Sequence, residues 1–445
     1  MKTFYIETYG CRMNICDSEV IISILSRAGM EYVENLSDAD VVILNSCSVR
    51  ENGHNKIYER LTLFSQQDEI REKCIVVVGC FASLLSEDIF GDYDFLDLIV
   101  NPNCYRQLPL LLTRINRGER HLFAVVRDND EMYGDILPDR KIEDITTAAV
   151  NVMKGCNQCC SYCIEPVTRG REHCRSVESV LRECTDIAEH GYREITLVGH
   201  IIDKYRYTDA TCGRTTDFAG LLKMVAKACP AQRIKFLSSH PSYFDDDIMN
   251  VVKSYPNIMR VVHLPLQSGS DSVLQRMNRG YTSGQFSSLV RHIRESISDM
   301  AIITDVMVGF CGETEEEFER TIALVKELEF DSINVFRFSM RSRTGAYLRY
   351  ADDIAEDEKR RRADVIIRLR DEIVERQYRK MIGKELSVVV ENYETDSTYC
   401  GRDMSHRTVR FSSLRTLKVN EVVNVVVTDA SSAALYGECN GNVGQ

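Results

Sequence analysis

The sequence predicts an α/β protein with an N-terminal open parallel sheet, a central partial (β/α)6 barrel and a small C-terminal all-β barrel. Three observations predict it. Strand-like apolar runs alternate with helical periodicity over residues 1–120. The same alternation resumes near residue 150 with longer helical segments. After Gly383 the pattern changes to short strands separated by polar turns.

Composition agrees with a soluble globular protein of two or three domains, because the chain has 445 residues, 44% apolar and 27% charged. No apolar run approaches the roughly 18 residues of a membrane span. The first residues enter a strand without a signal-peptide pattern, so we expect a cytoplasmic protein with no membrane contact. A net charge of −12 gives no global sign of nucleic acid, which must be argued locally.

The N-terminal region, residues 1–120, contains a first strand at Phe4–Ile6 and a helix at Asp17–Ala28 with apolar residues on one face. Further strands are predicted at Val41–Leu44 and Ile75–Val78. Both are continuous apolar runs, which suit a parallel sheet buried on both faces.

The cysteines of this region are placed informatively. In a cytoplasmic chain, 17 cysteines favour metal binding over disulfides. Cys11, Cys47 and Cys80 each follow a predicted strand, and the carboxyl ends of parallel strands share one edge. The sequence therefore predicts a metal site there; the alternative is three buried structural cysteines. Packing roles are expected for Cys16, Cys74 and Cys104.

Residues 121–145 are polar and acidic and read as a linker. The expected domains are therefore 1–120, a second domain at 146–380 and a third at 381–440.

The central region alternates between six strands and the helices that separate them. The strands are expected at Val150–Met153, Ile195–Val198, Ile234–Leu237, Val261–Leu264, Ile302–Val308 and Ile333–Phe338. The helices are expected at 177–190, 217–228, 244–254, 284–298 and 314–329. Such a barrel carries its chemistry at the carboxyl ends of its strands.

The first of these strands leads into Cys156, Cys160 and Cys163, a C-x3-C-x2-C spacing. Three thiolates so close in sequence can bind three irons of a [4Fe–4S] cluster, which leaves the fourth iron open to a ligand. A zinc site completed by His173 or Cys174 and a set of disulfides are the alternatives.

Short polar side chains and glycines follow the next strands. They are Gly199-His200, Ser238-Ser239-His240, Gln267–Ser270 and Gly309–Thr314. Each alone is typical of a turn, but together at one rim they describe a pocket. For His200, His240 and His263 we expect ordinary polar or packing roles, since a metal-binding histidine needs convergent partners.

The last part of the chain begins with a long helix over 356–381, whose cations are either interleaved with acids in solvent or directed at phosphates. Strands at Leu386–Val390, Thr408–Phe411 and Val422–Val427 then predict a small β-barrel, which favours a binding module. Its cations are Arg402, Arg407, Arg410, Arg415 and Lys418, about balanced by acids.

These motifs resemble the methylthiotransferases of the radical S-adenosylmethionine (SAM) superfamily along the whole chain. The matching stretches are Glu7–Asn14, Asp17–Glu19, Asn45–Asn52, Gly155–Cys163, Thr168–Glu172, Leu264–Ser270, Met277–Arg279 and Gly309–Thr314. The tail resembles the TRAM domain, on Gly401-Arg402 and Val409–Phe411.

The resemblance implies an N-terminal methylthiotransferase domain, a TIM-like radical SAM barrel and a TRAM barrel, with two [4Fe–4S] clusters and SAM as cofactors. Cys156, Cys160 and Cys163 would hold the cluster that binds SAM, and Cys11, Cys47 and Cys80 the auxiliary cluster that carries sulfur. The radical is borne by the cofactor, so no protein residue is expected to be catalytic. SAM contacts are expected from Tyr162, Arg171, Ser238, Gln267, Ser268 and Glu313.

The implied reaction inserts a methylthio group at C2 of N6-isopentenyladenosine at tRNA position 37, with one SAM as radical source and one as methyl donor. The implied partners are the anticodon stem-loop of tRNA and an electron donor such as flavodoxin or ferredoxin. The protein itself is expected to be a monomer. Alternatives are threonylcarbamoyladenosine of tRNA, an aspartate of a ribosomal protein, or a non-catalytic Fe–S RNA-binding protein.

Four positions depart from the family pattern. Residues 199–205 replace a Gln-Asn-Val-Asn-type run at the pocket, which bears on the substrate. Cys159 replaces an aromatic residue and can compete as a cluster ligand. Cys311 replaces a proline, and Met340–Arg343 replaces a Glu-Arg-Pro-Gly-type run.

Overall fold

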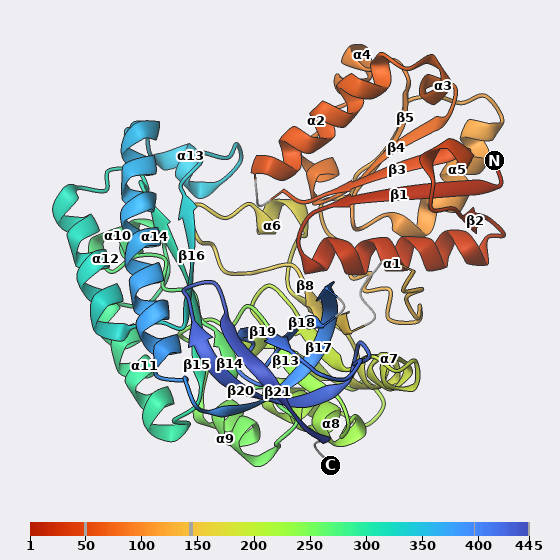
Figure 1. Ribbon diagram of the computed structural model, residues 1–445. Helices are drawn as coiled ribbons and strands as arrows, with labels where there is room; N and C mark the ends of the chain where they lie inside the picture. Colours follow the sequence, from red (N-terminus) through yellow and green to blue (C-terminus); the bar gives the residue numbers. More distant parts are fainter. Residues whose placement is uncertain (49–50, 142–145, 396, 444–445) are drawn as a thin grey trace.

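The computed structural model describes residues 1–48, 51–141, 146–395 and 397–443, so Val49 and Arg50 of one family motif lie outside it. The three predicted parts are present, and the N-terminal sheet stands beside the barrel with the short helix α6 (Glu165–Thr168) between them (Figure 1). None of the helices among these residues is both long and apolar enough to cross a membrane.

The N-terminal part is a six-stranded parallel sheet with strand order β2-β1-β3-β4-β5-β6. One apolar core packs α1 and α5 against one face, and a second packs α2 against the other. The strands are β1 (Thr3–Tyr9), β2 (Glu31–Tyr32), β3 (Val41–Ser46), β4 (Cys74–Gly79), β5 (Leu96–Val100) and β6 (Leu122–Ala124). The helices are α1 (Arg12–Arg27), η1 (Leu36–Asp38), α2 (Glu51–Ser65), α3 (Asp68–Arg71), η2 (Cys80–Leu84), α4 (Ile89–Asp92), η3 (Tyr105–Gln107) and α5 (Leu108–Asn116).

The sheet continues into the stretch expected to be a linker. β6 pairs in parallel with β5, so residues 122–124 belong to the first domain and the expected boundary at 120 is too early. A strand of three residues is too short to produce a periodic pattern, which is why the sequence did not reveal it. The end of this stretch, residues 142–145, lies outside the described residues.

The central part is the expected partial barrel, with two three-stranded parallel sheets in the orders β13-β10-β7 and β14-β15-β16. A parallel bridge between Ile234 and Ile258 helps to join the two halves, and one apolar core fills both. The barrel strands are β7 (Thr147–Asn151), β10 (Glu194–Val198), β13 (Arg233–Phe236), β14 (Val261–His263), β15 (Ala301–Val308) and β16 (Ser332–Arg337).

Helices cover the outside of this barrel. They are α7 (Val177–Glu189), α8 (Phe218–Ala228), α9 (Asp246–Ser254), α10 (Asp271–Arg276), α11 (Ser283–Ser296), α12 (Glu315–Leu328), α13 (Gly345–Arg349) and α14 (Glu356–Arg379). Short elements at the rim are β8 (Met153–Lys154), β9 (His173–Cys174), η4 (Ile202–Lys204), β11 (Arg206–Thr208) and β12 (Thr215–Asp217).

The C-terminal part is a closed five-stranded barrel with strand order β17-β18-β19-β21-β20. Two of its strands, β18 and β21, are absent from the sequence prediction because glycine and polar residues interrupt their apolar alternation. The strands are β17 (Glu385–Thr395), β18 (Thr398–Arg402), β19 (Thr408–Ser412), β20 (Val422–Ala430) and β21 (Leu435–Val443).

The C-terminal barrel is docked on the central one. Arg233 at the start of β13 donates to the carbonyl oxygens of Arg402 (2.7 Å) and Ser387 (3.1 Å). α14 packs along β16 and then adds Val374 and Tyr378 to the C-terminal core. The three parts therefore form one continuous body in which the tail cannot be treated as a free module.

The cations of α14 lie beside acids. Lys359, with a side chain only 1% exposed, pairs with Asp352 and Glu356, and the buried Arg362 pairs with Glu313. Further pairs on this helix are Arg360–Asp357, Arg361–Glu358, Arg376–Glu329 and Arg379–Glu375. The structure therefore favours the interleaved interpretation of this helix over a phosphate-binding face.

Replacing Gly401 by Ala should loosen the C-terminal barrel, because the added Cβ would lie 2.0 Å from the carbonyl oxygen of Val389. Overpacking of this kind costs about 1–3 kcal/mol. Hydrogen exchange of the β17 and β18 amides should accelerate. As the control, Gly91→Ala adds a Cβ with nothing within 4 Å and should leave these amides unchanged. Unchanged protection in Gly401→Ala would contradict the close packing.

Candidate functional site

The first cysteine triad lies at the carboxyl edge of the N-terminal sheet. Cys11 precedes α1 just after β1, Cys47 directly follows β3, and Cys80 directly follows β4. The thiols of Cys11 and Cys47 share a hydrogen bond, and Cys11 lies close enough to Cys47 and Cys80 to raise the pKa of each. Parallel strand ends thus bring the three thiols together, as the sequence predicted; their role as cluster ligands stays a prediction.

Close backbone packing fixes this edge. Gly79 has φ +92°, and a Cβ there would lie 2.3 Å from Oδ1 of Asn45. Asn45 itself is fully buried and donates to the carbonyl oxygen of Asn14 (2.8 Å) and to the hydroxyl of Ser18 (2.7 Å). These bonds hold the loop after β3 against the first turns of α1, which fixes Cys47 beside Cys11.

The thiols of this triad differ in acidity. The hydrogen bond from Cys47 lowers the pKa of Cys11 to about 6, and the same bond raises the pKa of Cys47. Burial raises the pKa of Cys80, which is 2% exposed. Thiolates are the metal-binding form, so one member is prepared for a metal and a bound metal would have to deprotonate the others.

The second triad lies in the loop after β8. Gly155 has φ +70°, and a Cβ there would lie 1.8 Å from the carbonyl oxygen of Arg171. The amide of Ser161 donates to the carbonyl oxygen of Met277 (2.9 Å), which ties the loop to the end of α10. Burial raises the pKa of Cys156 to about 12 and also raises the pKa of Cys163, with Cys160 close enough to contribute to both.

A short segment joins the two triads. Cys163 leads into α6, and the next residue after α6, Arg169, donates from Nε to the Sγ of Cys80 at 2.9 Å. The hydroxyl of Ser83 donates to the carbonyl oxygen of Thr168 at 3.0 Å. The sheet edge and the barrel rim therefore face each other across α6 (Figure 1).

Arg169 is held on its other side by a carboxylate. Its Nη1 and Nη2 donate to the two oxygens of Asp17 at 3.0 and 2.6 Å, and the hydroxyl of Tyr105 donates to the same carboxylate at 3.1 Å. Arg169 is 2% exposed and Asp17 is 7% exposed. A buried bidentate pair of this kind costs several kcal/mol to break, roughly 3–5 by mutation, so it locks the domains together.

A second arginine contacts the second triad. Nη1 of Arg279 lies 3.3 Å from the Sγ of Cys160 and 3.3 Å from the hydroxyl of Tyr162. Its Nε donates to the hydroxyl of Tyr281 at 3.1 Å. Arg279 is 6% exposed. Each cysteine triad thus has one buried guanidinium against one sulfur.

The zinc alternative finds no support. Among the described residues, no three or more His, Cys, Asp or Glu side chains converge to hold a metal ion. The thiol of Cys174 instead lies 3.5 Å from the amide of Arg206, and His173 lies 3.4 Å from Asp128. A cubane cluster differs from a single ion because each cysteine binds a different iron, so its three thiols need not converge on one point.

The remaining cysteines conform to simpler roles. The 17 cysteines remain thiols throughout, so the disulfide alternative is not supported. Cys16, Cys74 and Cys104 are buried, at 5%, 4% and 1% exposure, as expected of packing residues. Cys159 is exposed, with its thiol 3.7 Å from the carbonyl oxygen of Asn157.

Buried polar atoms without a hydrogen-bond partner gather at the barrel rim. Native proteins satisfy nearly all buried polar atoms, so such groups indicate a missing ligand or solvent. Several such atoms lie elsewhere among the described residues, but five lie at or beyond the carboxyl ends of five successive barrel strands. They are Oδ1 of Asn151, Nδ1 of His200, Nε2 of His240, Oε1 of Gln267 and Oε1 of Glu313. This set can bind a ligand with several polar groups, which fits the amino, carboxylate and hydroxyl groups of SAM.

His240 shows which partner one of these atoms needs. Its Nδ1 accepts from the amide of Ser242 at 3.2 Å, and burial lowers the pKa of the imidazole to about 3. The neutral ring must therefore carry its proton on Nε2, which is the unpaired atom. His240 thus offers a buried N–H donor to an acceptor in the pocket.

The other rim histidines have carboxylate partners. Nε2 of His200 lies 2.8 Å from Glu165 in α6, and Nε2 of His263 lies 2.9 Å from Asp305. His200 therefore connects the divergent 199–205 segment to the bridge between the triads. In the same segment, Asp203 accepts from the hydroxyl of Ser239 at 2.9 Å, and burial raises its pKa to about 7.

The six residues expected to contact SAM differ in their surroundings. Tyr162 lies in the second triad beside Arg279, while Ser238 and Gln267 have φ +70° and +69° at two strand ends. A positive φ in such residues is uncommon and marks a shaped site. These three residues therefore lie at the barrel rim or in the cysteine loop, and their contact with SAM stays a prediction.

The other three expected contacts have partners within the protein. Ser268 lies 3.3 Å from the hydroxyl of Thr321, and Glu313 uses Oε2 on the amide of Gly309 (2.6 Å) and on Arg362 (2.9 Å). The side chain of Arg171 is 83% exposed. Glu313 still has one unpaired oxygen at the rim, whereas only the backbone of Arg171 adjoins the cysteine loop.

The sequence alone did not single out three buried side chains that contact or support the triads: Arg169, Arg279 and Asp17. Each lies inside a motif that was noticed, but a motif does not say which residue turns inward. The available signal was an arginine close in sequence to, or in the same motif set as, the cysteine loops. An arginine is rarely buried unless it has a partner, so such residues are candidates for contacts with the triads.

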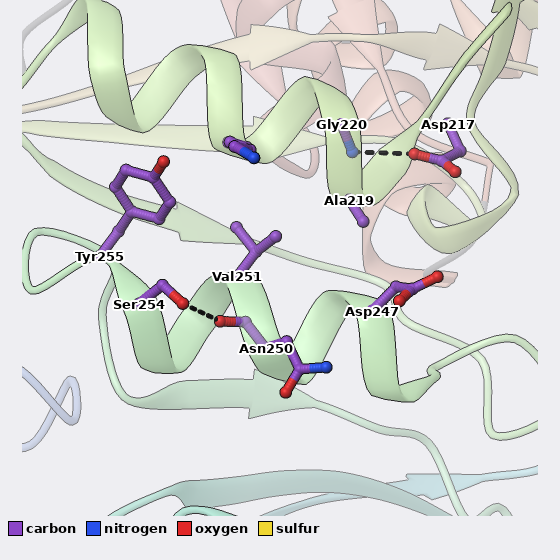
Figure 2. Close-up of a pocket in the computed structure, with 9 residues that line it drawn as sticks. Asp217, Ala219, Gly220, Asp247, Asn250, Val251, Ser254 and Tyr255 are labelled. Atoms are coloured by element: carbon purple, nitrogen blue, oxygen red, sulfur yellow. Dashed lines mark hydrogen bonds between the residues drawn. The ribbon is translucent and has the colours of Figure 1, made fainter.

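A separate groove of about 440 Å³ lies between α8 and α9 on the outer surface of the barrel (Figure 2). Its hydrogen bonds are internal to the helices, from the amide of Gly220 to Asp217 and from Ser254 to the carbonyl oxygen of Asn250. None of its lining residues belongs to either triad or to the rim, so it is a gap between two helices.

Comparison with known proteins identifies relatives of the whole chain. The family profile described as "Uncharacterized protein family UPF0004" matches residues 3–101, and the "Radical SAM superfamily" profile matches residues 150–325. A tRNA-2-methylthio-N(6)-dimethylallyladenosine synthase of Bacteroides thetaiotaomicron is 39% identical over 98% of this chain and 96% of its own. The corresponding protein of Porphyromonas gingivalis (strain W83) is 38% identical over 98% and 95%.

Solved structures show the same fold at low identity. The radical SAM methyltransferase TsrM of Kitasatospora setae, with a SAM analogue bound, has a TM-score of 0.57 at 15% identity and covers 76% of this chain and 73% of its own. The cobalamin-dependent radical SAM enzyme OxsB has a TM-score of 0.54 at 13% identity, covering 84% and 56%.

Anaerobic reconstitution should load about eight irons per chain, since each [4Fe–4S] cluster holds four. Cys47→Ala or Cys160→Ala should each remove about half of them, because each breaks one triad. Cys159→Ala is the matched control and should retain the full content, since its thiol is exposed and outside both triads. Iron and sulfide analysis gives the result. Loss of iron in Cys159→Ala would contradict the assignment of the second triad.

His240→Phe should weaken SAM binding about 2–10-fold, because one hydrogen bond is worth about 0.5–1.5 kcal/mol. Calorimetric titration of the reconstituted protein with SAM measures the change. His292→Phe, at an exposed site on α11, is the control and should bind SAM normally. Equal affinity in both variants would remove His240 from the pocket.

Proposed function

Since this chain belongs to the tRNA-2-methylthio-N(6)-dimethylallyladenosine synthase family within the radical SAM superfamily, we propose that it is a tRNA methylthiotransferase. Its substrate is N6-isopentenyladenosine at position 37 of tRNA, and the product carries a methylthio group at C2. Identity of 39% over 98% of the chain covers all three parts of the molecule.

The observation that carries this function is the bridge between the triads. Arg169, at the end of α6, contacts Cys80 of the first triad, while Cys163 of the second triad directly precedes α6. A methylthiolation needs a radical source and a sulfur source on the same carbon atom. The two cysteine triads facing each other across one short helix meet that requirement.

The cofactors divide the chemistry. When bound, the two [4Fe–4S] clusters supply the electron that cleaves SAM to a 5′-deoxyadenosyl radical and the sulfur that is transferred. In the net reaction the C2 hydrogen leaves in 5′-deoxyadenosine and is replaced by sulfur bearing a methyl group. One SAM yields methionine and 5′-deoxyadenosine, and a second SAM donates the methyl group and yields S-adenosylhomocysteine.

The protein positions and shields these groups. Cys156, Cys160 and Cys163 hold one cluster, and the unpaired rim atoms of Asn151, His240, Gln267 and Glu313 orient SAM beside it. Cys11, Cys47 and Cys80 hold the other. An unactivated C–H bond is not acidic enough for acid–base catalysis, so the cofactors carry out the C–H cleavage. The protein contributes orientation and exclusion of water.

The partners follow from this assignment. The C-terminal barrel and the region around α6 contact the anticodon stem-loop. A low-potential one-electron donor such as flavodoxin or ferredoxin supplies the reducing electron, and the chain acts as a monomer. The barrel does not present a continuous basic surface through these residues, because Arg402, Arg410 and Arg415 are each paired with a glutamate. Charge alone therefore gives this barrel little attraction for RNA, and recognition by RNA shape is favoured.

A second candidate substrate follows from the divergent 199–205 segment. His200 stands at the rim with an unpaired Nδ1 and a carboxylate partner in α6, where the family usually presents amides. A changed hydrogen-bonding set at the pocket favours a different base modification, such as threonylcarbamoyladenosine, with the same chemistry.

The test is nucleoside mass spectrometry of tRNA bearing isopentenyladenosine after incubation with the reconstituted protein, SAM and a reductant. We expect a mass gain equal to one methylthio group. Formation of 5′-deoxyadenosine without that gain would overturn the substrate and direct the search to threonylcarbamoyladenosine and ribosomal proteins. Failure to form 5′-deoxyadenosine by a cluster-loaded protein would favour a non-catalytic Fe–S RNA-binding protein.

Two variants separate the roles of the triads. Cys160→Ala should abolish 5′-deoxyadenosine formation, because the SAM-binding triad is broken. Cys47→Ala should keep that product and lose the methylthiolated nucleoside. Methylthiolated product from Cys47→Ala would refute the auxiliary role of the first triad.

A further inference from the structure

The two buried arginines that contact the triads differ in their counter-charges. Arg169 reaches Cys80 and Arg279 reaches Cys160, each from a buried position. Both can donate a charge-assisted hydrogen bond to a cysteine sulfur. The contacts on the far side of each guanidinium separate them.

Arg279 has only neutral groups on its far side. Its other contacts are the hydroxyls of Tyr162 and Tyr281 and the carbonyl oxygen of Pro265. Among the described residues, no carboxylate lies within ion-pair distance of it. Its positive charge is therefore matched by the sulfurs of the second triad alone.

The positive charge of Arg169 is balanced by a neighbouring carboxylate. Both of its terminal nitrogens bind the Asp17 carboxylate, so the pair carries no net charge beside Cys80. Tyr105 completes this carboxylate with a third hydrogen bond. Cys80 of the first triad thus accepts a hydrogen bond from Arg169, but the Arg169–Asp17 pair adds no net positive charge beside it.

Other nearby charges do not cancel this difference. Glu165 in α6 acts on Cys11, Cys47 and Cys80 as well as on Cys163, so it faces both triads. Lys204 acts on Cys156 but is paired with Glu172 at 2.7 Å. The contrast between Arg279 and the Arg169–Asp17 pair is what remains.

We propose that Arg279 and the Arg169–Asp17 pair set different reduction potentials at the two triads, so that the SAM-binding cluster is the easier one to reduce. Net charge and hydrogen bonds to the sulfurs set the potential of an iron–sulfur cluster, and a bare cation favours the reduced form. One electron from the external donor is then directed to the cluster that cleaves SAM, and no proton or other group moves with it. Both arginines act as positioning residues. This inference rests on the proposed assignment of two clusters.

The test measures each potential separately by electron paramagnetic resonance during redox titration. Full-length protein with Cys11, Cys47 and Cys80 replaced by Ala reports only the second triad. In that background, Arg279→Gln should shift the potential to more negative values, and Arg279→Lys, which keeps the charge, should stay closer to the parent. No shift in Arg279→Gln would overturn the role of Arg279.

The first triad gives the opposite test, in full-length protein with Cys156, Cys160 and Cys163 replaced by Ala. Asp17→Asn should uncover the charge of Arg169 and shift the auxiliary potential to more positive values. Arg169→Gln should shift it to more negative values, because Asp17 then remains as an uncompensated anion. Shifts of equal sign in these two variants would overturn the inference.

Iron content keeps the test separate from the proposed function. If both backgrounds bind about four irons and the potentials do not move, only this inference fails. If neither background assembles a cluster while the protein remains folded by circular dichroism, the two-cluster assignment fails, and with it the proposed function and this inference.

Discussion

The contact between Arg169 and Cys80 is the constraint on which the site depends. It joins a loop of the barrel to the edge of a sheet in another domain, and it is buried on all sides. Asp17 and Tyr105 hold the guanidinium from the sheet side, so the geometry is set by three elements at once. Two cysteine triads far apart in sequence are linked by this contact through the short helix α6.

The barrel rim is built on a different principle, in which polar side chains are left without partners. Asn151, His240 and Gln267 are partly or fully removed from water and still lack one hydrogen bond each. Such groups raise the free energy of the empty pocket and lower it again when a ligand with matching groups enters. The folded protein therefore holds these polar groups ready to bind a polar cofactor.

The fold could be predicted from sequence to the extent that burial is periodic. Long strands such as β15 and amphipathic helices such as α12 were predicted to within two residues, whereas β6 and β18 are short or interrupted and were missed. The position of Cys11, Cys47 and Cys80 at one sheet edge could be predicted because the carboxyl ends of parallel strands share an edge, whereas their role as ligands stays a prediction. The arginines could not, because which motif residue turns inward depends on packing between domains that no local pattern records. Arg171 was chosen for the pocket, and its neighbour Arg169 proved to be the buried one.

The brevity of the segment from Cys163 to Arg169 has a consequence for the RNA. Six residues span at most about 20 Å even when extended, and the helical turn of α6 shortens that reach. This short connection limits how far the two cysteine loops can separate along the chain. If the target base binds between the triads, it has to leave its stack, which would make the cost of unstacking part of substrate selection. Loops whose base at that position is already splayed outward would be modified fastest.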